Sequence, residues 1–353
     1  MNTITSALER PVPSAGTPAA DDPAAGLAVG TGRAQAKAIL FGEHSVVYGA
    51  PALAVPVAAL PAEAEASFAA DGVDRLYSAL YNGRLDRAPE RTLPTVTAIT
   101  AARAAVGATA GTTTGAAQRP LQVRVRSRIP AERGLGSSAA VAAAIVDAVA
   151  ALTGVTLTGG ERHDAVQTAE RAAHGTPSGL DARAVRAAGP IRFQDGAAVP
   201  LLVAAPLHLV IADSGVRGRT REAVQGVRER READRDGIDR IVGALGELCD
   251  LAVDALAEGD TATVGAAMTE AHALLNALGV GDPALDHLVS VAAAHEALGA
   301  KLTGGGRGGC ALILAADADH AATLSGALHE AGAAAVWTTM VAATDPRGEA
   351  PAR

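Results

Sequence analysis

Two carboxylates lie close together in a segment that also contains helix-breaking residues. Glu170 and Asp181 are eleven positions apart, which on one continuous helix would separate them by about 16 Å, too far to share a metal–phosphate centre. Gly175, Pro177 and Gly179 interrupt such a helix, so the chain can turn back and bring the carboxylates together. One could then hold Mg²⁺ and the other accept a hydroxyl proton. A helix end followed by an aspartate N-cap is the structural alternative.

A second segment, Gly134 to Ala140, reads Gly-Leu-Gly-Ser-Ser-Ala-Ala and precedes an alanine-rich stretch that predicts a helix. Glycines allow close approach of the backbone to a ligand, and the free N–H groups of a helix start attract phosphate. Ser137 or Ser138 could cap this helix or reach a phosphate-bound Mg²⁺. No Gly-Lys-Ser/Thr follows, so the segment is not a Walker A loop. An ordinary serine-capped helix is the alternative.

A third segment, Lys301 to Cys310, contains five glycines. Gly304, Gly306 and Gly309 formally match the dinucleotide pattern G-x-G-x-x-G, but that pattern opens a helix, whereas residues 310–315 predict a strand. We therefore expect a flexible glycine loop that approaches phosphates or shapes a site. A plain hairpin connection is the alternative.

Composition restricts the class of protein that carries these segments. The chain has 353 residues, 49% apolar and 19% charged, with a net charge of −8 and only 2% aromatic residues. This length favours two domains, and the charge and aromatic content argue against nucleic-acid and anionic-membrane partners. Two cysteines suit a reducing compartment. The absence of a long apolar run and of a signal-like start predicts a cytoplasmic protein.

The expected elements alternate between strands and helices. Residues 1–32 predict a disordered tail and residues 107–120 a long surface loop. Alternation and apolar runs predict strands and periodic segments predict helices. The strands are expected over 38–41, 52–57, 121–128, 207–212, 300–304, 310–315 and 335–343, and the helices over 138–152, 160–173, 219–236 and 319–332, with further helices up to about 298.

Read together, the segments resemble a known family. The run from Lys37, Lys-Ala-Ile-Leu-Phe-Gly-Glu-His-Ser-Val-Val-Tyr-Gly, resembles the first motif of the mevalonate kinases, within the galactokinase, homoserine kinase, mevalonate kinase and phosphomevalonate kinase (GHMP) superfamily. Residues 134–140 resemble its phosphate loop and 301–310 its third motif. Residues 170–181, with His-Gly-x-Pro-Ser-Gly-x-Asp, resemble the mevalonate kinase acidic segment. Asp213-Ser214-Gly215 with Thr220 resembles a piece of bacterial and archaeal members, and a bacterial, actinobacterial-like member is expected.

The resemblance implies an α+β, two-domain GHMP kinase fold with the active site between the domains. The N-terminal α/β domain, of the ribosomal S5 domain 2-like type, would cover residues 33–205. The C-terminal domain, ferredoxin-like with extra helices, would cover residues 206–345. Residues 1–32 and 346–353 would be tails.

The resemblance also implies ATP-dependent phosphorylation of the 5-hydroxyl of (R)-mevalonate, on the route to isopentenyl diphosphate. By position, Asp181 is the base near that hydroxyl and Lys37 lies beside it. Ser138 and Glu170 would hold Mg²⁺. The residues placed at the ATP phosphates are Lys37, Arg133, Gly134, Leu135, Gly136, Ser137 and Ser138. Those placed at mevalonate are Glu43, His44, Thr220 and Gly305.

Two departures and three alternatives accompany this interpretation. Gln35 and Ala36 stand where the family usually has Pro-Gly, and Arg307 stands at a usual glycine, where it could contact phosphate or point to solvent. A kinase for phosphomevalonate, a kinase for homoserine, and a non-catalytic ligand-binding relative remain open. A homodimer is compatible with the resemblance.

Overall fold

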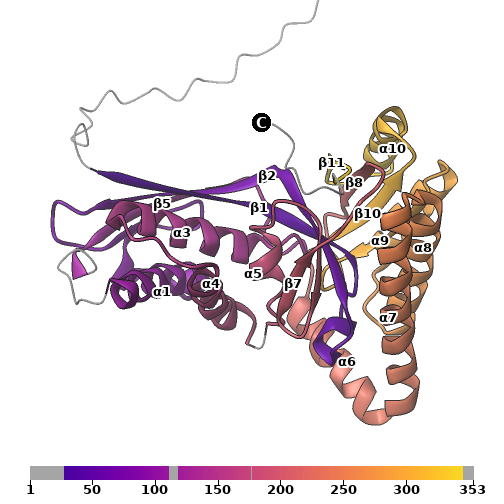
Figure 1. Ribbon diagram of the computed structural model, residues 1–353, viewed down its shortest axis with the longest axis horizontal. Coiled ribbons are helices and arrows are strands. Elements are labelled where there is room, and N and C mark those ends of the chain that lie inside the picture. Colours follow the sequence, from indigo (N-terminus) through magenta and orange to yellow (C-terminus); the bar gives the residue numbers. More distant parts are fainter. Residues whose placement is uncertain (1–27, 111–117, 176, 345–353) are drawn as a thin grey trace, which may run out of the picture.

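The computed structural model describes residues 28–110, 118–175 and 177–344. The first half is built on a seven-stranded sheet in the order β4-β3-β5-β2-β6-β7, with β1 paired to β2. The long antiparallel pair β1–β2 runs through the whole half (Figure 1). The strands are β1 (Val29–Phe41), β2 (Ala52–Phe68), β3 (Arg75–Tyr77), β4 (Asn82–Arg84), β5 (Leu121–Ser127), β6 (Ile191–Gln194) and β7 (Ala197–Pro200).

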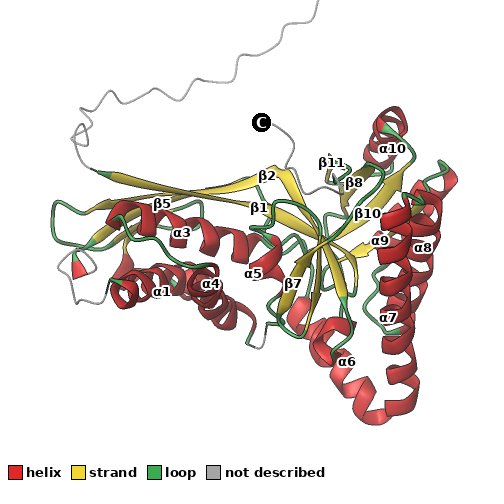
Figure 2. Ribbon diagram, in the orientation of Figure 1, coloured by secondary structure: helices red, strands yellow, loops and turns green. Residues whose placement is uncertain are grey.

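Helices cover one side of this sheet. α3 (Ser137–Thr153) packs directly on β1 and β2, while α1 (Leu93–Thr109) and α4 (Gly159–His174) form an outer layer against α3 (Figure 2). The short α5 (Leu180–Ala184) packs against α4 and β2. Most of α3 is buried alanine and valine, so the helix can approach the sheet closely. Short 3₁₀ turns are η1 (Ser45–Tyr48), η2 (Leu85–Arg87) and η3 (Glu90–Thr92).

The second half has its own four-stranded antiparallel sheet in the order β11-β8-β10-β9. Its chain order is strand, helices, two strands, helix, strand, which is a ferredoxin-like pattern with additional helices. The strands are β8 (Leu207–Asp213), β9 (Gly299–Thr303), β10 (Cys310–Ala315) and β11 (Ala335–Val341). The helices are α6 (Thr220–Ala233), α7 (Arg235–Glu258), α8 (Thr261–Ala277), α9 (Pro283–Ala294) and α10 (Ala318–Glu330).

The expected mixed α/β, two-domain architecture is confirmed. One cluster of buried apolar residues includes members from both halves. Contacts of β1 with β9 and of β2 with β11 join the two sheets. Within the described part of the chain, no helix is long and apolar enough to cross a membrane.

The structure corrects three expected boundaries. Residues 29–32, expected in the tail, belong to β1 because they pair with the end of β2 and because Gly30 and Gly32 leave no Cβ against the backbone of α3. α1 continues to Thr109, into the expected loop, of which residues 111–117 lie outside the description, as do residues 1–27 and 345–353 of the tails. The helix expected over 219–236 breaks at Asp234, whose carboxylate accepts the Gly237 N–H at 2.9 Å and caps α7.

Candidate active site

The free edge of β1 organises the site. Three alternate residues on this edge donate their N–H groups to three different segments: Gln35 to the Val185 carbonyl at 3.1 Å, Lys37 to the Leu135 carbonyl at 3.1 Å, and Ile39 to the Thr303 hydroxyl at 2.9 Å. Because side chains and N–H groups repeat every second residue in a strand, one strand edge can hold the chain after α5, the phosphate loop and the third motif at fixed spacing.

Lys37 connects three of the four segments that the sequence singled out. Its ammonium lies 3.1 Å from the Asp181 carboxylate and donates to the Gly134 carbonyl at 2.9 Å. The Lys37 side chain is 3% exposed and that of Asp181 is 35% exposed. A buried cation therefore faces a carboxylate that is open to an incoming molecule, which is suited to stabilising developing negative charge.

The phosphate loop leaves a helix N-terminus uncapped. α3 begins at Ser137 after Gly136, which has a φ of 72°, and among the described residues no side chain caps this end. The alternative of an ordinary serine-capped helix is therefore wrong: the Ser137 hydroxyl donates to the Ile129 carbonyl at 3.5 Å. The Leu135 side chain is buried in the core, so Leu135 can take part in the phosphate loop only through its backbone. The unused N–H groups and the positive end of the α3 dipole form a site for an anion.

Ser138 and Glu170 meet at the base of this loop. Both are shielded from solvent, and in the described chain neither Ser138 Oγ nor Glu170 Oε1 has a hydrogen-bond partner. Burial, helped by the neighbouring Asp181 carboxylate, raises the pKa of Glu170 to about 7, while the Ser138 hydroxyl and Lys37 act in the opposite direction. The hydroxyl is thus near enough to influence the carboxyl but outside hydrogen-bond geometry.

These orphaned oxygens fit a magnesium ion. Mg²⁺ takes oxygen ligands and is commonly held by one or two carboxylates together with phosphate oxygens and water. No group of three or more His, Cys, Asp or Glu side chains that could hold a metal occurs in the described ranges. A cation at Ser138 and Glu170 would therefore depend on a bound phosphate for further ligands.

His44, Gly305 and Thr220 converge from three different elements. His44 Nε2 lies 2.9 Å from the Gly305 carbonyl, which can only accept, so Nε2 carries the proton. A Cβ on Gly305 would collide with the Thr220 side chain at the start of α6. Burial lowers the pKa of His44 to about 4, so at neutral pH the imidazole is an uncharged hydrogen-bonding group.

The structure turns Glu43 away from this cluster. Glu43 was expected to face the substrate, but it is 1% exposed and its carboxylate is paired with the ammonium of Lys301, which is fully buried. The two groups are 258 positions apart in the chain, which explains why no local pattern predicted the pairing. Lys301 is a functional candidate that sequence reasoning placed in a motif without giving it a role.

The side chains of the two motif arginines, Arg133 and Arg307, contact other parts of the protein. The Arg133 Nε lies 2.7 Å from the Asp213 carboxylate, and its Nη2 donates to the Gly215 carbonyl at 3.3 Å. The Arg133 side chain therefore stabilises the turn after β8, which leaves only the backbone of Arg133 to contact a phosphate. Arg307 is partly exposed: its guanidinium packs against Gly226 of α6, its Nε donates to the Gly279 carbonyl at 3.5 Å, and its charge helps to lower the pKa of His44.

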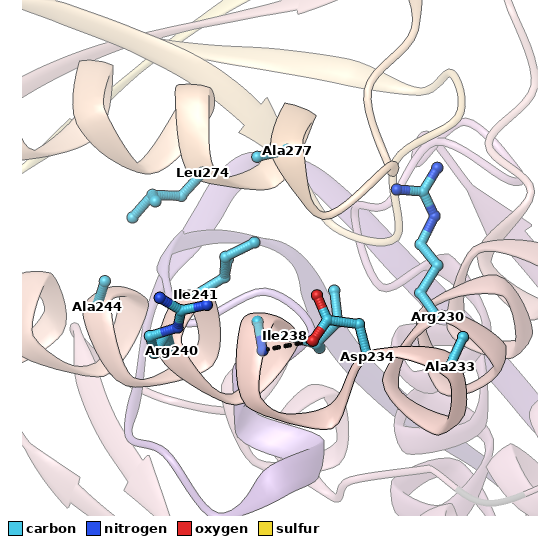
Figure 3. A pocket seen from close by; sticks show the side chains of 10 residues that line it. Arg230, Ala233, Asp234, Ile238, Arg240, Ile241, Ala244, Leu274 and Ala277 are labelled. Atoms are coloured by element: carbon cyan, nitrogen blue, oxygen red, sulfur yellow. Dashed lines mark hydrogen bonds between the residues drawn. The ribbon is translucent and has the colours of Figure 1, made fainter.

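A groove of the described surface lies apart from these residues. This groove of about 700 Å³ runs between α7 and α8, where Ile238, Ile241 and Leu274 face one another and Arg230 stands at one end (Figure 3). None of the site residues predicted from the sequence lines it.

Comparison with known proteins places this geometry in a family. Family models for the GHMP kinases N terminal domain and the GHMP kinases C terminal match residues 96–188 and 252–334. The mevalonate kinase of Thermococcus sibiricus is 35% identical over 301 residues, which cover 80% of this chain and 88% of the relative. That of Pyrococcus horikoshii is 34% identical over 306 residues, which cover 80% of this chain and 87% of the relative. The chain belongs to the mevalonate kinase family of the GHMP kinases.

A solved structure agrees with this family. The structure of L. major mevalonate kinase in complex with R-mevalonate has a TM-score of 0.74 at 26% identity, covering 89% of this chain and 96% of that one. The expected bacterial, actinobacterial-like affiliation is not supported, because the mevalonate kinases that match at 33–35% identity are archaeal. The N-terminal family match contains the phosphate loop and acidic segment, and the C-terminal match contains the third motif.

We expect Gly134→Ala to damage the mevalonate kinase site more than its fold. Gly134 has a φ of 78°, and a Cβ there would lie 2.6 Å from the Thr303 carbonyl oxygen, a backbone atom that cannot yield easily. Gly154, at the end of α3, has a φ of 68° with open space around it. Gly154→Ala therefore isolates the backbone strain, about 1–2 kcal/mol. Gly134→Ala should lower the free energy of unfolding by more than Gly154→Ala does, and it should also raise the KM for ATP. Equal effects of the two variants would contradict the close contact between the phosphate loop and the third motif.

Proposed function

We propose that the chain transfers the γ-phosphoryl group of ATP to the 5-hydroxyl of (R)-mevalonate, giving 5-phosphomevalonate and ADP. The observation that carries this proposal is the buried Lys37 ammonium, held between the Asp181 carboxylate and the phosphate loop at Gly134. Membership of the mevalonate kinase family supports the choice of substrate.

The chemistry follows from this arrangement. Phosphoryl transfer depends mainly on positioning and on stabilising charge at the transferred group. The Asp181 carboxylate is open enough to accept the proton of a hydroxyl placed beside it. The Lys37 ammonium is placed to stabilise the charge that develops on the attacking oxygen and on the phosphoryl group.

Binding of ATP would use the N-terminus of α3. The N–H groups that follow Gly136 and the α3 dipole would meet the phosphates, and residues 134–138 would wrap them. Ser138 and Glu170 would hold Mg²⁺, since their orphaned buried oxygens suit it. When bound, the ion would neutralise phosphate charge and orient the γ-phosphoryl group. The Lys37 ammonium, which donates to the Gly134 carbonyl, would complete the ATP site from the side of β1.

Mevalonate would lie against His44, Gly305 and Thr220. Because the imidazole is neutral, His44 would orient the substrate by hydrogen bonding through Nδ1 and not by charge. Glu43 would act from behind this surface, without touching the substrate. We favour mevalonate over phosphomevalonate as the acceptor, because a second phosphate needs further cations and Arg133 is paired with Asp213. Arg307, whose charge acts on His44, is the one motif arginine that could meet such a phosphate, and the acceptor panel below tests it.

The test is steady-state ADP release with Mg-ATP and a panel of acceptors: mevalonate, phosphomevalonate, homoserine and galactose. We expect the highest kcat/KM with mevalonate and no turnover in Asp181→Asn. A higher kcat/KM with another acceptor would keep the catalytic centre but overturn the substrate. Absence of turnover with all four would favour a non-catalytic relative.

Several features outside the site belong to the same proposal. The enzyme would act in the cytoplasm, supplying isopentenyl diphosphate synthesis, with mevalonate and ATP as its partners. We propose domains over residues 33–205, extended to 29 by the strand that the structure shows, and over 206–345. A homodimer is the proposed assembly.

A further inference from the structure

A buried ion pair lies directly behind the proposed mevalonate surface. Lys301, in β9, has 0% of its side chain exposed and Glu43, just after β1, has 1%. Besides the Glu43 carboxylate, the Lys301 ammonium donates to the Leu302 carbonyl at 2.8 Å and approaches the Ile39 carbonyl at 3.4 Å. All of its partners are therefore inside the protein.

The pair belongs to a polar joint between the two sheets. Thr303, two residues after Lys301, donates to the Ile39 carbonyl at 3.1 Å and accepts the Ile39 N–H at 2.9 Å. Ile39 lies in β1 of the first sheet and Lys301 and Thr303 in β9 of the second. This joint fixes the end of β1 relative to the end of β9 in both distance and direction.

The residues that follow this joint in the chain, on both the β1 side and the β9 side, belong to the proposed substrate surface. His44 follows Glu43, and Gly305 comes two positions after Thr303, where its carbonyl receives the His44 Nε2–H at 2.9 Å. His44 has a φ of 61°, a conformation that is unusual for a residue other than glycine. Such a conformation persists when the surroundings hold it.

We propose that the Glu43–Lys301 pair is a positioning device for the mevalonate site, which holds His44 and the Gly305 peptide in register without contacting substrate. The inference rests on the proposed function, since it assigns a role at the same site. The pair is not explained by stability alone, because burying two charges opposes folding unless geometry and hydrogen bonds compensate. In the described chain Glu43 Oε2 still has no hydrogen-bond partner.

The test removes the charges without leaving one of them alone. The double variant Glu43→Leu with Lys301→Met replaces the pair by apolar side chains of similar size, a change that often preserves folding. We expect the KM for mevalonate to rise about tenfold or more, since small misplacements of positioning groups have large kinetic effects, with kcat and the KM for ATP changing much less. The imidazole ¹⁵N signals of His44 should lose the single Nε2–H pattern.

Arg103→Met is the matched control. It removes the cation of a partly buried pair, Arg103–Asp74, on the outer part of the first half. This control should lower the melting temperature while leaving the KM for mevalonate and the His44 signals unchanged. If the double variant does not fold, Glu43→Gln with Lys301→Met, which also leaves no buried charge and keeps the size of the Glu43 side chain, is measured in the same way and is expected to change the same two readouts.

The outcomes separate the inference from the proposed function. Wild-type protein that fails to phosphorylate mevalonate would overturn the function, while the His44 spectrum would still report on the pair. Wild-type turnover, together with variants whose KM for mevalonate and His44 signals match the wild type, would overturn the inference alone.

Discussion

Replacing Lys37 by methionine should lower kcat by about 10³-fold, in the range found when a group that stabilises transition-state charge is removed. Lys37 is the ammonium that lies 3.1 Å from Asp181 and 2.9 Å from the Gly134 carbonyl, so the change removes both the charge at the reaction centre and the bridge to the phosphate loop. Asp181 remains partly exposed and can be solvated. We therefore expect the variant to fold.

Single-turnover measurement of phosphoryl transfer, with saturating ATP and mevalonate, isolates this effect from product release. Arg126→Met is a suitable control, because Arg126 pairs with Glu65 on an exposed part of the sheet and its loss should leave the rate unchanged. A Lys37→Met rate within tenfold of the wild type would show that the ammonium does not stabilise the transition state.

Glu170→Gln should abolish most activity and, in the absence of ligands, stabilise the fold above neutral pH. The wild-type carboxyl has its pKa raised from 4.5 to about 7, mainly by burial and secondly by Asp181. A raised carboxyl pKa means that the folded state binds the proton more tightly than the unfolded state. The resulting stability is complete below about pH 4.5 and is lost as the pH rises through 7, by about 3 kcal/mol. Glutamine does not ionise and avoids this loss.

Urea denaturation at pH 5 and pH 8, with EDTA and no nucleotide, measures this difference. We expect Glu170→Gln to resemble the wild type more closely at pH 5 and to be more stable at pH 8. Glu247→Gln changes an exposed carboxylate in the middle of α7 and should have no such pH dependence. Equal stability differences at the two pH values would contradict the raised pKa, and full activity of Glu170→Gln would contradict its role at the cation.

The raised pKa of Glu170 has a functional consequence. At neutral pH this buried carboxyl is about half protonated, because ionisation is unfavourable without a nearby cation. Binding of Mg²⁺ with ATP would favour the ionised form, so it would release a proton and offset the free-energy cost of burying the charge. The folding stability that the ligand-free protein loses by burying this carboxylate would then be recovered on binding, which favours the protein with Mg²⁺ and ATP bound.

The segments of the candidate site were predictable because they are short and have distinct local signals. The glycine-serine turn before α3, the broken helix after Glu170 and the glycine run after Lys301 were each legible from residue type and spacing, and β1 brings the first two together as expected. The alternation in residues 121–128 likewise predicted β5.

What could not be predicted depends on contacts between distant parts of the chain. The resemblance placed Glu43 at the substrate, but its distant partner Lys301 decides which way the carboxylate points. Residues 29–32 looked like part of a tail because glycines weaken a strand pattern, whereas here they admit the backbone of α3. Both features arise from tertiary packing that local patterns do not encode.

Lys37 and Asp181 form the centre that we propose phosphorylates the 5-hydroxyl of mevalonate. The most direct measurement is ³¹P and ¹H NMR of the product formed from ATP and (R)-mevalonate, by wild type and by Asp181→Asn. We expect one phosphate ester, coupled to the C5 protons, formed in equal amount to ADP by the wild type and not by the variant. ADP formed without that ester, or an ester still formed at the wild-type rate by Asp181→Asn, would contradict it.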